Sequence, residues 1–280
     1  MTSAPAVFFP FIQAQGRYLG AVGLGAKAAE FMVRGLPGGW GNTHRPAWPL
    51  ALPDGFLYTR PRWRRSIPRD TVSAWRNAMK TLYDMERSGN CYKVRLLLAL
   101  LGEDYERVTV DLTREEPREA SFLALNPRGE IPVLVEDDQA IWDSGAILVY
   151  LATQAVDRHW FPDAALARAR VTQWLAVAAN EVHHGLAAAR AIRLFGRTGD
   201  LAQSQAVGRC ALTLLDQQLA RGPWLAGEAP SIADIACYPY VSIAEEGALS
   251  LAPYQNVARW CRNIESLPGY TPMMARQPSA

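Results

Sequence analysis

The chain has 280 residues, enough for two domains, and its 49% hydrophobic and 20% charged residues are typical of a globular protein with a core. A formal net charge of +2 argues against a dedicated nucleic-acid binder, and no apolar run reaches the roughly 18 residues of a membrane span. The four cysteines lack CxxC or zinc-ligand spacing, and the four histidines form no metal set. We therefore expect free thiols, no metal and a reducing, cytoplasmic location.

Residues 1–78 differ in composition from the rest of the chain. They hold ten of the 29 basic residues and three of the 27 acidic residues, a net charge of +7 against −5 for the remainder. Closely spaced prolines over 35–69 prevent a sustained helix or a central strand. We expect 1–78 to be an irregular or disordered basic extension, and an upstream start assignment before Met79 is an alternative origin for it.

From residue 79 onward, strand and helix signals alternate. Strands are expected over 80–84, 105–112, 131–135 and 140–142, and a tight turn at Asp137-Asp138 makes the last two an antiparallel hairpin. Helices are expected before the stop signal Gly102, over 117–125, and from a cap at Ser144 onward. This order predicts an α/β domain over 79–157 with a partly parallel sheet covered by helices.

After Asp163 the strand signals stop. Apolar residues follow helical periods over 164–195, 200–221, 231–246 and 255–266, after a linker near 155–163. Ser231 and Asp234 fit a capping box at the start of the third of these helices. The second domain, 163–280, is therefore expected to be an all-α helical bundle.

The corner between the first strand and the first helix carries Ser88 and Asn90. A helix N-terminus offers unpaired N–H groups and a partial positive charge of about +0.5. A serine hydroxyl there can donate to a thiolate of a bound ligand and hold its pKa below that of a free thiol. The alternative is that Ser88 or Asn90 is only a helix cap.

Two further segments carry polar or exposed groups at element ends. If the Ile131–Pro132 bond is cis, the backbone of Ile131 turns outward and can pair with an extended peptide; the alternative is an ordinary edge-strand proline. Asp143 can pair with an ammonium group, and Ser144 at a helix N-terminus can bind a carboxylate. The alternative for this pair is a simple helix cap.

Taken together, in their order and spacing, LYDMERSGNCYKVRLLLALLG, NPRGEIPVL and DSGAILVYLA resemble the glutathione-binding domain of the cytosolic glutathione S-transferase family, in its theta-like and bacterial serine-type members. The resemblance covers 79–280. It implies a thioredoxin-like domain with a mixed four-stranded sheet, followed by an all-α domain. It also implies a homodimeric, cytoplasmic detoxification enzyme that needs glutathione and a small electrophile, and no metal, nucleic acid or membrane.

The resemblance assigns the thiol-binding corner to particular residues. Ser88 stands where the family's serine activates the glutathione thiol, and Asn90 shares or takes over that contact. Tyr83 matches the family's strand tyrosine, at a spacing that suits the serine classes better than the tyrosine classes. Cys91 offers a further possibility, because cysteine-using relatives form mixed disulfides with glutathione.

The remaining glutathione contacts follow from the other two segments. Ile131, before the expected cis Pro132, is implied to bind the cysteinyl backbone of glutathione, and Asp143 and Ser144 its γ-glutamyl end. Glu130 stands in the same binding stretch, where the family often has lysine, and Asp143 is shorter than the usual glutamate. Loss of that lysine leaves the glycine carboxylate to another basic side chain, with candidates Arg87, Lys93 and Arg128.

The electrophile pocket is expected in the first helices of the second domain, around His183 and Ala187. Asn180, His183, Ala187 and Arg190 lie at helical spacing and share one face, although a solvated polar face is the alternative. Two other functions remain open. One is a glutathione-dependent disulfide reductase or peroxidase, and the other is a non-enzymatic binding module whose basic tail contacts a partner.

Overall fold

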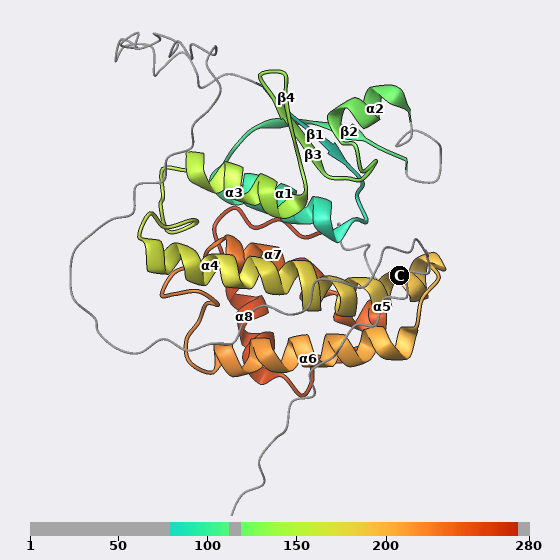
Figure 1. The fold of residues 1–280 in the computed structure, drawn as a ribbon. Coiled ribbons are helices and arrows are strands. Elements are labelled where there is room, and N and C mark those ends of the chain that lie inside the picture. The colour runs from blue at the N-terminus through green and yellow to red at the C-terminus, as the bar shows by residue number, and fades with distance from the viewer. Residues whose placement is uncertain (1–78, 112–118, 274–280) are drawn as a thin grey trace, which may run out of the picture. The chain divides into compact units, whose positions relative to one another are not determined.

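The structure, a computed structural model, describes residues 79–111 and 119–273 (Figure 1). The basic extension predicted over 1–78 lies outside the described residues, as do parts of the segments predicted over 105–112 and 117–125. Within the described ranges the chain forms a sheet with three helices, followed by a purely helical half.

The sheet has four strands in the order β2-β1-β3-β4, formed by Lys80–Asp84 (β1), Tyr105–Thr109 (β2), Val133–Glu136 (β3) and Gln139–Trp142 (β4). β1 runs parallel to β2 and antiparallel to β3, so the predicted mixed sheet is confirmed. The hairpin from β3 to β4 turns at Asp137 and Asp138, which have φ of 50° and 60°. Two successive positive φ values are those of the tight hairpin turn that matches the twist of a sheet.

Three helices accompany the sheet: Gly89–Leu101 (α1), Ala120–Leu125 (α2) and Ser144–Gln154 (α3). The ends of α1 follow from the sequence, because Ser88 caps its start and Gly102 ends it in the left-handed conformation, with φ of 65°. Figure 1 shows α1 and α3 side by side between the sheet and the helical half. These two helices therefore carry the interface between the domains.

The helical half contains Ala165–Val177 (α4), Ala188–Phe195 (α5), Leu201–Leu219 (α6), Ile232–Ser242 (α7) and Gln255–Glu265 (α8). The expectation of one α-helix over 164–195 was wrong in its middle, where 178–187 (η4) is π-helical. η4 crosses α6 at Gly185 and Gly208, where a β-carbon built on Gly185 would lie 2.4 Å from the Gly208 nitrogen. Likewise, the helix expected over 231–246 ends as α7 at Ser242, and a short 3₁₀ turn, Ala244–Gly247 (η5), follows it.

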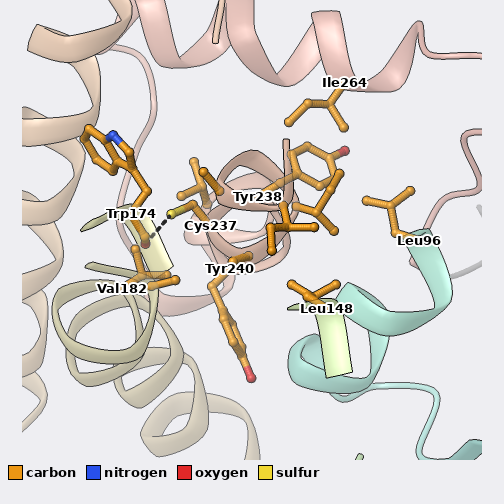
Figure 2. Packing of buried hydrophobic residues seen from close by; sticks show 14 of the residues in the cluster. Leu96, Leu148, Trp174, Val182, Cys237, Tyr238, Tyr240 and Ile264 are labelled. Carbon is orange, nitrogen blue, oxygen red and sulfur yellow. Dashed lines mark hydrogen bonds between the residues drawn. The ribbon is translucent and has the colours of Figure 1, made fainter. Parts of the chain in front are cut away.

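The central helix of the core is α7, in which every residue over 232–241 is buried. Figure 2 shows its Cys237 and Tyr238 among side chains from α1, α3, α4, η4 and α8, while Tyr240 points away from Tyr238. The predicted capping box is confirmed: the Ser231 hydroxyl accepts from the Ala233 amide, and Asp234 accepts from the Ser231 amide at 2.9 Å. α7 packs against both α1 and α3, which makes the two halves share one core.

Candidate functional site at the end of the sheet

Strand register brings the three predicted segments to one end of the sheet. Val133 pairs with Tyr83 of β1 on one side and with Trp142 of β4 on the other. Continued by two residues, the antiparallel register with β4 places Ile131 opposite Ser144. The corner after β1, the segment before β3 and the start of α3 therefore lie at the same edge.

Ser88 is the N-cap of α1, and its hydroxyl oxygen accepts a hydrogen bond of 3.3 Å from the Cys91 amide. The side chain is half-buried. A hydroxyl has one donor hydrogen and two acceptor lone pairs, so capping leaves the O–H of Ser88 able to donate. The cap and the contact with a thiolate are thus compatible roles for one side chain.

Three consecutive carbonyl oxygens before Ser88 each accept from an arginine. Arg95 of α1 donates from Nη1 to Met85 at 3.3 Å and from Nη2 to Glu86 at 2.8 Å. Arg190 of α5 donates from Nη1 to Arg87 at 2.9 Å. Two guanidinium groups, one from each domain, thus hold the backbone of the corner.

Arg95 is itself held by a buried carboxylate. Its Nη1 lies 2.5 Å from Oδ1 of Asp84, the last residue of β1, which is fully buried. Arg107 of β2 forms a second ion pair with the same carboxylate. Because buried charges require compensation, this pairing ties the end of β1 to α1 and sets the direction in which the corner leaves the sheet.

Asn90 follows in the first turn of α1. Its side-chain oxygen is buried and has no hydrogen-bond partner among the described residues. Next to it, Gly89 lies under the ring of Tyr240, whose buried hydroxyl group has its pKa raised to about 12 by burial. The Asn90 side-chain oxygen is thus a buried, unsatisfied acceptor at the start of α1.

Cys91 is fully buried on the sheet side of α1, in a small cluster with Phe122 and Ile131. Burial, followed by the charge of Asp84, raises the pKa of its thiol to about 12. A neutral, inaccessible thiol is a poor nucleophile. Tyr83 is also turned to this side, where its ring meets Phe122 edge to face at 5.8 Å.

The Ile131–Pro132 bond is cis, as the sequence analysis expected. Both residues are buried, and they precede the paired register of β3. The loop before them is fixed by Asn126, whose amide donates to the Glu130 carbonyl at 2.6 Å and accepts from the Arg128 amide at 3.0 Å. The carboxylate of Glu130 is exposed and pairs with the Arg128 side chain at 2.9 Å, so these two side chains engage each other.

The cap of α3 is Asp143, and the prediction of Ser144 in that place was wrong by one residue. Asp143 Oδ1 accepts from the amides of Gly145 and Ala146 at 2.8 and 3.3 Å. Asp143 has φ of 74°, which is unfavourable for a residue with a side chain. Ser144 is the first residue of the helix and is buried. The second oxygen of Asp143 makes no hydrogen bond with another described residue.

Lys93 is 5% exposed, and its ammonium lies 5.5 Å from the centre of the Tyr240 ring. Burial lowers the pKa of Lys93 to about 8, and the electrostatic interactions with Cys237 and Asp143 offset part of that effect. Within 79–111 and 119–273 no carboxylate forms an ion pair with it. The corner thus contains a buried cation that lacks an anionic partner.

The residues predicted for the electrophile pocket are split by the π-helical segment. Asn180 and His183 are exposed, whereas Ala187 and Arg190 are buried. In a π-helix the hydrogen bonds join residues five apart, so residues spaced for one face of an α-helix do not share one face there. Desolvation, then His184 and Lys93, lower the pKa of His183. His183 thus lies within electrostatic range of the first domain.

Arg190, expected on the pocket face or on a solvated polar face, is instead buried against the corner before Ser88. The sequence analysis did not identify Arg95 or Tyr240 as part of the site. The available signals were a charged residue inside the apolar run of α1 and a tyrosine six residues after Asp234 of the capping box. Neither signal identifies its partner, because Arg95 bonds back across the strand-to-helix corner to Asp84 and Tyr240 covers a residue of the other domain.

Some absences hold for the described part of the chain alone. No helix there is long and apolar enough to cross a membrane. No three potential metal-binding side chains come together within those residues. All four cysteines are described and free, as the sequence predicted.

Comparisons with known proteins agree with this geometry. Residues 79–153 match the family described as "Glutathione S-transferase, N-terminal domain", and 201–263 match its C-terminal domain. Glutathione S-transferase GstB of Escherichia coli is 30% identical over 68% of this chain and 95% of its own length. The disulfide-bond oxidoreductase YfcG of E. coli is 30% identical over 64% and 87%. A glutathione S-transferase structure from Pseudomonas fluorescens superposes with a TM-score of 0.67 at 36% identity, over 71% of this chain and all of that one.

These matches cover both domains, in the order that the structure shows, and they include a relative matched over nearly its whole length. The thioredoxin-like sheet, the cis Ile131–Pro132 bond and the Ser88 cap lie within the matched regions. The chain therefore belongs to the glutathione S-transferase family, and it is a transferase that acts with glutathione.

Proposed function

We propose that Ser88 stabilises the thiolate of bound glutathione, which then attacks a small electrophile. The thiol proton leaves to solvent, a carbon–sulfur bond forms, and the leaving group departs with the electrons of the bond it breaks. The carrying observation is that the Ser88 hydroxyl accepts from the Cys91 amide and so keeps its own hydrogen for a thiolate. The helix N-terminus adds positive potential at the same point.

The rest of glutathione is proposed to extend along the end of the sheet. The backbone of Ile131, outside the strand register, pairs with the cysteinyl unit. The free oxygen of Asp143 binds the γ-glutamyl ammonium, and Ser144 with the start of α3 binds the carboxylate. An unfavourable φ at Asp143 supports a functional role, because such strain persists where a site requires it.

The test is conjugation of an aromatic chloride by purified protein carrying Ser88→Ala or Asn90→Ala. We expect Ser88→Ala to lower kcat/KM about 100-fold, the usual cost of one lost donor to a developing anion. Ser231→Ala is the matched control, because it removes a capping hydroxyl far from the site. Full activity in both Ser88→Ala and Asn90→Ala would contradict the proposal.

The electrophile is proposed to bind beside His183 and Ala187, across from the glutathione thiol. Support comes from Arg190, three residues after Ala187, whose guanidinium binds the Arg87 carbonyl beside Ser88. Replacement of His183 by alanine should change KM for the electrophile more than KM for glutathione. An equal effect on both constants would place the electrophile elsewhere.

A second candidate is glutathione-dependent disulfide exchange, favoured by the relationship to YfcG. Burial of Cys91 and the raised pKa of its thiol argue that any such turnover uses glutathione thiols alone. Cys91→Ala should then retain disulfide turnover, and its loss would assign the reaction to Cys91.

We also propose a cytoplasmic homodimer with a role in detoxification, which rests on the family resemblance. Sedimentation equilibrium of the full chain should give twice the mass of 30.9 kDa. A monomer at micromolar concentration would contradict the dimer.

A further inference from the structure

Arg190 is an unusual residue to find at the domain interface, because it is buried and charged and yet one nitrogen is unpaired. It is 4% exposed, and its Nε lies 2.5 Å from Oε2 of Glu246. Its Nη1 donates to the Arg87 carbonyl at 2.9 Å, while Nη2 has no partner among the described residues. One nitrogen of this group therefore binds a carboxylate of its own domain, one binds the backbone of the first domain, and one is buried without a described partner.

Helix α5, which carries Arg190, also contacts the side chain of Arg87. The guanidinium of Arg87 lies 5.0 Å from the centre of the Phe195 ring, and the guanidinium of Arg190 lies 5.1 Å from it. Backbone and side chain of Arg87 are thus both bound by α5. Since Ser88 is the next residue, any shift of α5 relative to α1 moves the hydroxyl that caps α1.

The charge of Arg190 also reaches the start of α1. Burial raises the pKa of the Tyr240 phenol, and the charge of Arg190, together with a backbone hydrogen bond of Asn90, opposes that effect. The Tyr240 ring covers Gly89, the first residue of α1. A cation at this place favours negative charge on a ligand bound beside Ser88.

We propose that Arg190 is a positioning residue of the helical domain that fixes the Ser88 corner and places a buried cation beside the glutathione thiolate. This inference rests on the proposed function. Arg190 acts through the Arg87 carbonyl and does not itself contact the reacting atoms. The helical domain thereby takes part in thiol activation as well as in binding the electrophile.

The test compares Arg190→Met and Arg190→Lys with Arg193→Met. Arg193 is the matched control, because it lies on the same helix, is exposed, and reaches only the Glu246 carbonyl at 3.4 Å. We expect Arg190→Met to lower kcat at least about tenfold, since small displacements of catalytic groups cost up to about 100-fold. KM for glutathione should change less than about threefold, because Asp143 and Ser144 are untouched.

Ultraviolet absorbance of the thiolate in the glutathione complex gives a readout that does not depend on turnover. Arg190→Met should show less thiolate than wild type at the same pH, and Arg190→Lys should restore it while kcat stays low. Lysine keeps the charge but lacks the planar fork that binds Glu246 and Arg87 together. Arg193→Met should match wild type in both measurements.

The outcomes separate this inference from the proposed function. An active wild type with Arg190→Met equal to Arg193→Met in kcat and thiolate absorbance overturns the role of Arg190. If Arg190→Met does not fold, Arg190→Lys decides, and wild-type kcat in that variant overturns it equally. A wild-type chain that neither conjugates nor binds glutathione overturns the proposed function, and this inference falls with it.

Discussion

The ring of Tyr240 lies directly against the Cα of Gly89, at the first residue of α1. A β-carbon built at residue 89 would lie 2.6 Å from ring atoms Cε1 and Cζ. The two residues belong to different domains and are 151 positions apart in sequence. Glycine is therefore required here for close approach of a ring, because the backbone itself has no unusual conformation.

Replacement of Gly89 by alanine should destabilise the fold by about 1–3 kcal/mol, the usual cost of overpacking a buried contact. Displacement of the ring or the helix should also move Ser88 and lower kcat. Urea unfolding and conjugation kinetics measure both effects. Gly222→Ala is the control, because its β-carbon would meet nothing within 4 Å. Equal stability of the two variants would show that the ring yields freely.

Asp143→Asn should separate the capping role of this residue from its binding role. The amide oxygen still accepts from Gly145 and Ala146, so the free energy of unfolding should fall by less than about 0.5 kcal/mol. The negative charge is lost, so KM for glutathione should rise about tenfold or more, as expected for a charged hydrogen bond. Asp143→Ala should lose both functions. An unchanged KM in Asp143→Asn would remove the ammonium contact from the proposal.

Lys93→Met should stabilise the protein at pH 7. Burial lowers the pKa of Lys93 to about 8 from an ordinary value of 10.5, so its charge costs up to about 3 kcal/mol below pH 8. Between about pH 8 and 10.5 the unfolded chain binds the proton and the folded chain does not, so wild-type stability rises with pH relative to Lys93→Met. Urea unfolding of both proteins from pH 7 to 10 measures the difference. A difference that does not change with pH would contradict the lowered pKa.

Asp234→Ala should be the most destabilising single change in the helical domain, at about 3–5 kcal/mol. The fully buried carboxylate accepts from the amides of Leu225 and Ser231 and from the indole nitrogen of Trp260. Its removal leaves these donors buried and unpaired. Ser231→Ala should cost only about 0.5–2 kcal/mol, because it removes the cap and one of the donors to Asp234 while the carboxylate keeps its other three. Thermal unfolding measures the order of the two variants, and a reversed order would contradict this assignment.

Structural features that depend on residues within a few positions of one another were predictable from the sequence. Gly102, the Asp137-Asp138 turn and the Ser231 cap each depend on backbone geometry within a few positions, and all three were confirmed. The alternation of strand and helix signals predicted a partly parallel sheet, and the resemblance implied its four mixed strands. The cap of α3 was misplaced because Asp143 and Ser144 are both good caps, and only the structure shows that Asp143, with φ of 74°, takes that place.

Features that depend on contacts between the domains were not predictable. The π-helical segment crosses α6 where Gly185 approaches Gly208, and Arg190 binds a carbonyl 103 positions away. Periodicity assigned Arg190 to a helix face but could not identify what that face meets. The burial of Lys93 likewise depends on Tyr240 of the second domain.

Arginine side chains bind the backbone carbonyl oxygens of Met85, Glu86 and Arg87. The backbone of this corner is therefore held by contacts that do not involve the side chains of these three residues. A substitution of the exposed Glu86 leaves these backbone contacts in place, whereas Met85 also packs against the cluster that contains Cys91. The converse holds for engineering. A corner transplanted into another thioredoxin-like scaffold would keep its shape only if equivalents of Arg95 and Arg190 were transplanted with it.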